Sequence, residues 1–483
     1  MFVKKVLVIH LISILFLVCV APLAAQQRLD VSGMGLGRAT VAFARGTDAL
    51  TVNPANIITN DTSLALRFTV MPVGVMVGSS VFSIKDINYY FGGDGTIDSG
   101  GHWNPRYLSP TERDEFVRMV DNGIIATQTE TMPIGIVVNI PNFGSVGFSI
   151  INSLQMQLQF PANFSKIFDG YGGKDPLDLS GGLYNVLMFS SYGITYAQSI
   201  RSVDVNRDFL NTVNIGLTVK YIRGYSFQGV DKSNTAKITP FIPATWDSTY
   251  DWAVDLRYKA QQAGTLQQEL SVGNFTGFGG TTAGSGIGLD MGFWGTFTKP
   301  DSSGRQASFA FSLLDIGSIT WSTATKSYNA DVRDTIKGIA QLSDEQIDRL
   351  KGAAHTESFI TLLPMRFRLG VCIPLGTIVW GIPVTAMADY TQGLVTAGVN
   401  TTIPRVGVGF QFGEKGILGR IGFQAGGLEG LGVSAGIGSN WENVNFDISA
   451  GSVRALLGYA SAHLFDYSLG VKFRVPVQSL LFF

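Results

Sequence analysis

Charged residues are scarce in this sequence of 483 residues. Only 15% of its residues are Asp, Glu, Lys or Arg, whereas an average soluble domain has about 25%. The formal net charge is -1, so the chain has no basic excess with which to bind nucleic acid. Its hydrophobic content of 45% is too high for a disordered chain. The composition therefore argues against an ordinary soluble enzyme, a nucleic-acid-binding protein and a disordered protein.

Cysteine and histidine are too few for the usual metal sites. The two cysteines are Cys19 and Cys372, and Cys19 lies in a segment that we expect to be removed. One remaining thiol forms neither an intrachain disulfide nor a multi-cysteine metal site. The four histidines are scattered along the chain without ligand spacing, so we predict no metal site and no cofactor. The sequence also lacks a Gly-x-Ser-x-Gly motif, a histidine near a candidate nucleophile and an obvious carboxylate pair, so we predict no catalytic residues and no enzyme activity.

Long apolar runs are missing after the first 25 residues. Lys4 and Lys5 precede a mostly apolar stretch at 6–20, and Ala-Pro-Leu-Ala-Ala follows at 21–25. This order is typical of a secretory signal peptide. We therefore predict a signal peptide at 1–25, cleaved after Ala25, with an uncleaved membrane anchor as the alternative. No later run of about 20 apolar residues exists, which excludes a bundle of inner-membrane helices.

The sequence is rich in period-two alternation. Val213, Ile215 and Leu217, for example, alternate with Thr212, Asn214 and Gly216, and similar patterns recur from residue 63 to the end. A soluble β-sandwich also alternates, but three features favour a transmembrane barrel. Many predicted strands have about 10 or more residues, the second face is small and polar rather than charged, and the connections differ greatly in length. In lipid the sheet must close, because every backbone N–H and C=O group needs a partner.

Fifteen strands are counted, and because bacterial single-chain barrels have even numbers, we predict an all-β antiparallel barrel of about 14 strands, with 12–16 allowed. The weakest assignment is the first pair, which Pro72 separates. The predicted strands lie at 63–70, 73–84, 131–140, 144–158, 186–200, 211–227, 283–297, 306–322, 358–373, 376–391, 403–413, 417–427, 429–440, 443–453 and 465–475.

The connections are predicted to be very short on one side of the membrane and long on the other. Short connections are expected at 141–143, 374–376 and 413–415, and long loops at 85–130, 160–185, 231–282 and 322–357. Ser109-x-x-Glu112 and Ser343-x-x-Gln346 are capping-box patterns that predict short helices at 110–120 and before Gly352. We interpret both helices as parts of loops, and a helix that binds a partner is the alternative.

The last residue, Phe483, ends an alternating stretch that includes Val471, Phe473 and Val475. A final amphipathic strand with a terminal aromatic residue resembles the signal recognised by the outer-membrane barrel assembly machinery. Pro476 removes a backbone donor, so the strand itself is expected to stop at about residue 475. We therefore predict contact with the assembly machinery through Phe483.

A family resemblance lies directly after the predicted signal peptide. Residues 32–42 are Ser-Gly-Met-Gly-Leu-Gly-Arg-Ala-Thr-Val-Ala, and residues 48–57 are Asp-Ala-Leu-Thr-Val-Asn-Pro-Ala-Asn-Ile. This opening resembles that of the FadL/TodX family of outer-membrane transporters for hydrophobic compounds. PorV-type proteins of type IX secretion and uncharacterised FadL-like barrels have a similar opening. The motif therefore identifies the superfamily but does not distinguish its members from one another.

The resemblance implies a plug segment at 26–60 in the lumen of a barrel at 61–483 that has long extracellular loops. It also implies a hydrophobic ligand that leaves sideways through a break in a strand. The residues that we assign to the plug or the ligand are Gly33, Gly35, Gly37, Arg38, Arg45, Asp48, Asn53, Pro54 and Ala55. The three glycines allow the backbone to bend close to the barrel wall. The charged residues are expected to pair with Asp290, Arg366 or Arg368, and anchoring of the plug is an alternative to direct ligand contact.

Three functions remain open from the sequence. The first is a FadL-like channel in the bacterial outer membrane for hydrophobic small molecules such as long-chain fatty acids or hydrocarbons. The second is a PorV-like barrel that binds secretion components or other outer-membrane proteins. The third is a general or structural porin, which the predicted plug and the scarcity of predicted inward charge disfavour. Outer-membrane lipid is an expected partner in each case, and an apolar pocket is expected beside the plug.

Overall fold

The computed structural model describes most of the chain. The described residues are 29–58, 65–91, 93, 96, 104, 106–167, 176–201, 212–241, 251–264, 280–297, 306–337, 344–379, 381–427, 430–441, 444–457 and 464–476. The predicted signal peptide and Phe483 lie outside these residues, so both assignments stay predictions.

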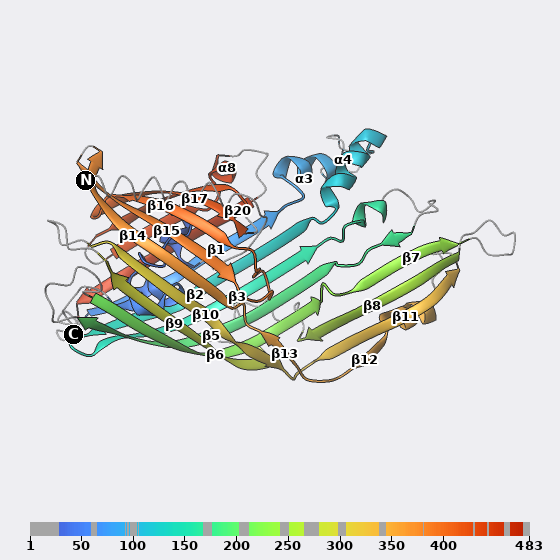
Figure 1. Ribbon diagram of the computed structural model, residues 1–483, viewed down its shortest axis with the longest axis horizontal. Coiled ribbons are helices and arrows are strands. Elements are labelled where there is room, and N and C mark those ends of the chain that lie inside the picture. The colour runs from blue at the N-terminus through green and yellow to red at the C-terminus, as the bar shows by residue number, and fades with distance from the viewer. Residues whose placement is uncertain are drawn as a thin grey trace.

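Fourteen antiparallel strands close into one barrel, because each pairs with the next in chain order and the last pairs with the first (Figure 1). The predicted strand number is therefore confirmed. The barrel strands are β1 (Ala65–Ser79), β2 (Ile124–Ile140), β3 (Gly144–Gln159), β5 (Leu183–Arg201), β6 (Thr212–Val230), β9 (Gly284–Thr296), β10 (Ser308–Trp321), β14 (Arg366–Val379), β15 (Ile382–Gly393), β16 (Arg405–Phe412), β17 (Gly416–Gly426), β18 (Gly432–Asn440), β19 (Val444–Ala450) and β20 (Leu464–Pro476).

The alternation places apolar side chains outside the barrel and polar ones inside. On β6, Leu217 and Val219 are 44% and 51% exposed, whereas Thr218 and Lys220 are buried. This is the reverse of a soluble protein, whose apolar residues face the core. A closed sheet with an apolar exterior satisfies its backbone groups in lipid. The protein is therefore an outer-membrane β-barrel.

Several predicted boundaries need correction: β2 begins at Ile124 rather than at 131, and the predicted strand 358–373 is divided between β13 and β14. The strands predicted at 63–70 and 73–84 are joined in one strand, β1, which ends at Ser79 and in which a bulge at Met71 (φ 49°) and Pro72 accommodates the proline. The short connection predicted at 374–376 is wrong, because β14 continues to Val379 and β15 begins at Ile382. Gly376 (φ 81°) instead marks an irregularity within the β14–β15 pairing. The turns at 141–143 and 413–415 are confirmed.

Three predicted long loops contain strands of a further sheet. The strands β4 (Leu177–Asp178), β7 (Thr235–Phe241), β8 (Asp251–Ala263), β11 (Lys326–Lys337) and β12 (Ala353–His355) form a sheet that extends past the barrel (Figure 1). It joins the barrel because β8 also pairs with the end of β6, and β13 (Phe359–Leu362) pairs with β10. These strands were not predicted from the sequence because their exposed faces carry charged residues, whereas the outward faces of the membrane-spanning strands are apolar.

The helices lie in the connections. They are α3 (Ile84–Phe91), α4 (Pro110–Val120), η3 (Phe164–Ile167), α7 (Asp344–Lys351) and α8 (Val453–Leu456). The predicted helix at 110–120 is confirmed as α4 with its capping box, in which Ser109 and Glu112 bond reciprocally to the backbone. The second predicted helix is α7, and it ends before Gly352 (φ 71°). No helix in the described part of the chain is long and apolar enough to cross a membrane.

Candidate functional site

Residues 29–58, here called the N-terminal segment, contain three short helical turns. These are α2 (Val31–Met34), η1 (Gly46–Thr51) and η2 (Pro54–Ile57). Asp30 caps α2 by accepting a hydrogen bond from Gly33 N at 2.9 Å, and Asn53 caps η2 by accepting one from Ala55 N at 3.1 Å. All residues of the segment are buried or half-buried. A segment this short has no core of its own, so it is covered by the barrel strands that it contacts.

Backbone groups of the N-terminal segment bond to side chains of several strands. Thr40 N and Val41 N both donate to Asp389 Oδ2 on β15, at 2.7 and 2.8 Å. Two strands away from β15 in the wall, Ser312 Oγ on β10 donates to Val52 O at 2.8 Å. Gly37 N donates to Ser434 Oγ on β18 at 2.9 Å. The segment is thus attached to distant strands, and its path is fixed on more than one side.

Asn53 links the segment to the wall as well as capping η2. Its Nδ2 donates to Phe293 O on β9 at 3.0 Å. Asn56 Nδ2 donates to Val41 O at 2.8 Å, which ties η2 to the preceding part of the segment. The predicted role of Asn53 in local backbone bonding is therefore observed, together with a contact to the barrel that the sequence did not indicate.

Glycines line the wall where the N-terminal segment passes. A Cβ added to any of these glycines would lie less than 3.0 Å from an atom of the segment: Gly147, Gly216, Gly292, Gly407, Gly409 and Gly422. On the segment itself, Gly37 adopts φ 61°, and a Cβ on Gly35 would lie 2.9 Å from Gly436 Cα. The predicted close approach of the segment backbone to the wall therefore depends on glycines of the wall as much as on glycines of the segment. From the sequence, the wall glycines were recognised only as small residues on the polar face of each strand.

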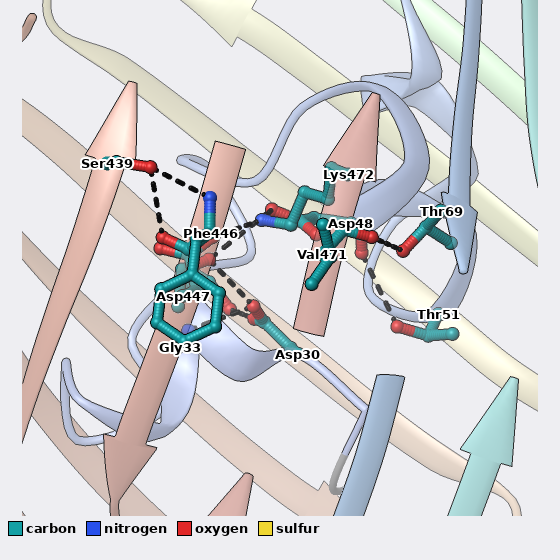
Figure 2. Close-up of polar contacts among 12 residues, drawn as sticks. Asp30, Gly33, Asp48, Thr51, Thr69, Ser439, Phe446, Asp447, Val471 and Lys472 are labelled. Atoms are coloured by element: carbon teal, nitrogen blue, oxygen red, sulfur yellow. Dashed lines mark hydrogen bonds and ion pairs between the residues drawn. The ribbon is translucent and has the colours of Figure 1, made fainter. Parts of the chain in front are cut away.

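An ion network joins the segment to the last strands (Figure 2). Lys472 Nζ on β20 lies 2.6 Å from Asp48 Oδ2 and 2.7 Å from Asp447 Oδ2 on β19. Asp447 also pairs with Arg420 on β17. The four side chains are buried or half-buried, and they carry two positive and two negative charges. The network as a whole is therefore neutral.

A second group of ion pairs lies on the inner wall. Lys220 Nζ on β6 contacts Asp290 and Asp315 at 2.7 and 2.6 Å, and Arg366 Nη2 on β14 contacts Asp315 at 2.7 Å. Arg368 Nη2 lies 3.4 Å from Asp389 Oδ2. The expectation that inward charge is scarce is therefore wrong. The charges are present but are paired across neighbouring strands, which is how buried charge is tolerated.

The predicted pairing of the segment's charged residues is correct in part. Asp48 forms an ion pair, but with Lys472 rather than with Arg366 or Arg368. Arg38 contributes its carbonyl oxygen, which accepts from Arg368 Nη2 at 3.1 Å. Arg45 lies with its guanidinium carbon 4.5 Å from the centre of the Trp294 ring, a cation–π contact.

The barrel ladder is interrupted at one level of β1 and β2. Met71 and Pro72 of β1 have no Cα partner in β2 or β20 in the described ladder, and Met132 and Pro133 of β2 have none in β1 or β3. Proline has no N–H group to donate, so two prolines at one level weaken the wall locally. We call this place the ladder break.

An apolar cluster lies on the inner side of the ladder break. Met132 at the break and Ile151 of β3, which lies opposite it, pack with Leu50, Val52 and Ile57 of the N-terminal segment. A Cβ added to Gly470 of β20 would lie 3.2 Å from Pro72 Cβ and 3.0 Å from Val31 Cγ2. The N-terminal segment therefore contacts the wall at the level of the ladder break.

A cavity of about 630 Å³ lies on the other side of the segment, beside Arg45 and Asp48. Its lining includes charged residues of both signs, such as Arg420 and Lys472. The cavity is therefore not the purely apolar pocket that was expected beside the plug, because charged side chains line it together with apolar ones such as Phe43 and Leu418. No cluster of three metal-ligating side chains occurs among the described residues.

Comparison with family models gives a match over residues 54–406, to a family described as a family of unknown function, DUF5723. The chain belongs to the DUF5723 family. The matched range begins at Pro54 in η2 and reaches the first residues of β16, so it includes the ladder break and the first nine strands of the barrel. No curated protein matches this DUF5723 chain.

Among solved structures, the DUF5723 chain is similar to two toluene transporters and a FadL homologue. The toluene transporter TbuX of Ralstonia pickettii is 12% identical with a TM-score of 0.41, covering 92% of this chain and 97% of TbuX. The toluene transporter TodX of Pseudomonas putida is 9% identical with a TM-score of 0.42, covering 94% and 98%. A FadL homologue of Pseudomonas aeruginosa is 12% identical with a TM-score of 0.43, covering 94% and 98%.

Proposed function

We propose that this protein is an outer-membrane channel for hydrophobic small molecules, with the N-terminal segment as its plug and the ladder break as its lateral exit. The observation that supports this most strongly is the position of the apolar cluster, which lies directly behind the two-proline interruption in β1 and β2. A hydrophobic molecule that moved from this cluster through the wall would pass into lipid without entering water.

The energetics favour such a route. Apolar surface gains about 25 cal/mol per Å² when it leaves water, so a hydrophobic molecule is held equally well by an apolar interior and by the bilayer core. Moving between them costs little if the wall opens. Opening at the level of the ladder break breaks few hydrogen bonds, since Pro72 and Pro133 donate none. The apolar cluster is packed in this structure, so passage requires the N-terminal segment to shift.

A disulfide across the ladder break tests the exit. The β1–β2 register is the same on both sides of the ladder break, where Val70 pairs with Ile134 and Val73 with Thr131. Met71 and Pro133 therefore stand opposite each other across the break, and we expect their Cα atoms to lie within the range of about 4.4–6.8 Å that a disulfide needs. The variant Met71→Cys/Pro133→Cys is expected to abolish uptake of radiolabelled toluene and dodecanoate when oxidised. Reduction with dithiothreitol is expected to restore it.

The matched control uses an intact part of the same two strands. Val75 and Thr129 are Cα partners four residues from the break, so Val75→Cys/Thr129→Cys adds a disulfide without sealing the break. Its uptake is expected to equal that of the parent protein under both redox conditions. Undiminished uptake by the oxidised Met71→Cys/Pro133→Cys variant would exclude the ladder break as the route. No difference between cells with and without the parent protein would exclude transport of these molecules altogether.

A second candidate function is the binding of a partner protein, and one observation favours it. The sheet of β7, β8 and β11 extends past the barrel with ion pairs on its exposed residues, such as Arg257 Nη2 with Asp255 Oδ2 at 3.2 Å and Arg333 Nε with Asp255 Oδ2 at 3.6 Å. Charged, projecting sheets are suited to specific protein contacts. Affinity purification from crosslinked cells tests this: a partner lost on Arg257→Glu but kept in the Met71→Cys/Pro133→Cys variant would support it.

A further inference from the structure

The connection between β15 and β16 folds into the barrel instead of projecting from it. It comprises residues 394–404, here called the β15–β16 loop. The loop leaves the barrel at the end opposite to the short turn at 413–415, and this end is the extracellular one in barrels of this kind. Loops in such a position are ordinarily exposed to water, but residues 397–400 are buried. The tip of the loop therefore lies inside the lumen.

A tight turn forms this tip. Asn400 N donates to Ala397 O at 2.9 Å, which closes the turn, and Gly398 in its second position adopts φ 57°. Glycine is favoured in this left-handed conformation, so the local sequence specifies the turn. Asn400 also holds the base of the loop, since its Nδ2 donates to Val395 O at 2.7 Å and to Met365 O, next to β14, at 2.9 Å. The loop thus keeps its shape on its own side of the barrel.

Val399 at the tip contacts the opposite wall. Its N donates to Gln155 Oε1 on β3 at 3.1 Å, and its side chain packs with Met76 of β1 and Ala126 of β2. β2 and β3 are the second and third of the fourteen barrel strands, whereas β15 and β16 are the ninth and tenth. Seven strands therefore separate the two places in either direction around the wall, which means that the loop spans the lumen.

The β15–β16 loop crosses the lumen at a different level from the N-terminal segment. β3 runs from the periplasmic turn at 141–143 towards the extracellular loops, and the segment packs against Ile151 of this strand. Gln155 lies four residues further along, which is about 13 Å in a strand that rises roughly 3.3 Å per residue. Ser153, between the two contacts, is buried. The lumen is therefore closed twice, by the segment on the periplasmic side and by the loop on the extracellular side.

The two closures are held by different kinds of contact. The N-terminal segment is attached through the ion pair of Asp48 and Lys472. The tip of the loop is held to the far wall by an uncharged hydrogen bond and by the packing of Val399, and residues 394–404 include no charged residue. Uncharged hydrogen bonds are weaker than those of charged groups, so the extracellular closure is the easier of the two to open.

We propose that the β15–β16 loop is an extracellular gate. It is closed while its tip rests on Gln155, and it opens when the tip leaves β3 and the base stays attached through Asn400. The opened gate gives access from outside the cell to the lumen above the N-terminal segment. In the proposed transport the gate controls entry of the hydrophobic molecule, and this role rests on the proposed function.

Labelling of a thiol behind the gate tests the inference. Ser153→Cys places a thiol between the two closures, in a chain that also carries Cys372→Ala to remove the cysteine of the barrel. A sulfonated maleimide, which does not cross lipid, is added to intact cells. The reference is Ser322→Cys, on an exposed extracellular connection. Ser153→Cys is expected to react about 10- to 1,000-fold more slowly than the reference, because an open state populated at about 0.1–10% limits the reaction.

A charge at the tip is expected to open the gate. Val399→Asp places a carboxylate in the apolar contact with Met76 and Ala126, where an unpaired charge is unfavourable. The tip should leave the wall, and labelling of Ser153→Cys should become at least about tenfold faster. Attraction of the reagent does not account for such an increase, since the reagent is itself an anion. Val399→Ser removes the packing without adding a charge and is expected to act in the same direction, which provides the comparison if Val399→Asp does not assemble.

The matched control is Thr402→Asp. Thr402 is exposed in the same loop, so the same charge at this position is expected to leave the labelling rate of Ser153→Cys unchanged. Heat-modifiable gel migration checks that each variant retains the barrel. Labelling after unfolding in dodecyl sulfate gives the amount of thiol for each variant.

Three results would overturn the gate. They are labelling of Ser153→Cys as fast as that of Ser322→Cys, a slow rate that assembled Val399→Asp and Val399→Ser leave unchanged, and an equal acceleration by Thr402→Asp. The experiment measures access and not uptake. Failure of the disulfide experiment at the ladder break would therefore leave the labelling result unaffected, and the reverse also holds.

Discussion

Lys472 Nζ on β20 lies 2.6 Å from Oδ2 of Asp48, and 424 residues separate the two in the chain. β20 closes the barrel by pairing with β1. The ion pair thus connects the first described part of the chain to its last strand. One consequence is that this anchor of the N-terminal segment exists only when the barrel is closed.

Replacement of Lys472 is expected to loosen the N-terminal segment. In Lys472→Met, Asp48 and Asp447 lose their shared cation and two carboxylates remain near each other. Removing one partner of a buried ion pair costs about 3–5 kcal/mol, which is enough to detach a segment of 30 residues from part of the wall. We expect proteases added from the periplasmic side to cleave residues 29–58 in the variant and to spare them in the parent protein.

The control for this experiment is Lys237→Met. Lys237 pairs with Asp178 at 3.4 Å, but their side chains are 53% and 44% exposed, and such surface pairs are worth about 0–1 kcal/mol. Equal protection of residues 29–58 in Lys472→Met and Lys237→Met would show that the ion pair does not hold the segment.

The wall glycines are expected to be intolerant of a side chain. In Gly292→Ala the new Cβ would overlap Asn53 Oδ1 and lie 2.9 Å from Ala55 N. Overpacking of this kind costs about 1–3 kcal/mol, so the temperature at which the folded band disappears on a heat-modifiable gel should fall. Gly419→Ala is the matched control, since its nearest neighbour would be Phe412 Cβ at 3.9 Å. An unchanged transition in Gly292→Ala would mean that the segment is not packed against β9.

The barrel could be predicted because the alternation of apolar and polar residues is visible within each short stretch of the sequence. The strand count was also within reach, since Pro72 was recognised as the weak boundary and β1 is in fact one strand with a bulge there. The strands β8 and β11 were missed because both faces of the projecting sheet lie outside lipid. Arg257, Asp255 and Arg333 interrupt the apolar pattern that identifies a membrane-spanning strand.

The inward charges were visible in the sequence but their pairing was not. Lys220, Asp290 and Arg366 each occupy an inward position of an alternating strand, yet their partners belong to strands far away in the chain. Register between strands decides which charges meet, and a single sequence does not specify it. The ladder break was missed for the same reason: Pro72 and Pro133 become one feature only when β1 and β2 are aligned.

Outward apolar residues are expected to contact lipid. Substitution of single outward residues by arginine tests this contact. Val219 lies in the middle of β6 and is 51% exposed, whereas Ile417 lies next to the β16–β17 connection and is 76% exposed. An arginine at mid-membrane costs about 2–4 kcal/mol and one near the interface about 0–1. We therefore expect Val219→Arg to reduce the amount of folded protein in the outer membrane far more than Ile417→Arg. Equal effects would mean that β6 does not face the bilayer core.

Low pH is expected to destabilise α4, which lies at the end of the barrel that carries the long loops. Glu112 accepts a hydrogen bond from the Tyr89 hydroxyl, and its Oε2 accepts one from Ser109 N at 2.7 Å, with Arg106 Nη2 at 3.0 Å from Oε1. These bonds favour the ionised form and lower the pKa of Glu112 from 4.5 to about 2. A lowered pKa means that the stabilisation is complete above 4.5 and is lost as pH falls towards about 2.

Pepsin is active in this range, so cleavage within α4 measures the loss directly. In the parent protein, cleavage between Pro110 and Val120 is expected to increase as pH falls from 4.5 towards about 2, because protonated Glu112 no longer accepts the bonds that join α4 to Tyr89 and Ser109. In Glu112→Ala the side chain that accepts these bonds is missing at every pH, so cleavage should already be high at 4.5 and change little below it. Glu115→Ala on the same helix lies outside the capping box and should follow the parent curve. Parallel curves for Glu112→Ala and Glu115→Ala would show that the capping box does not hold α4 in place.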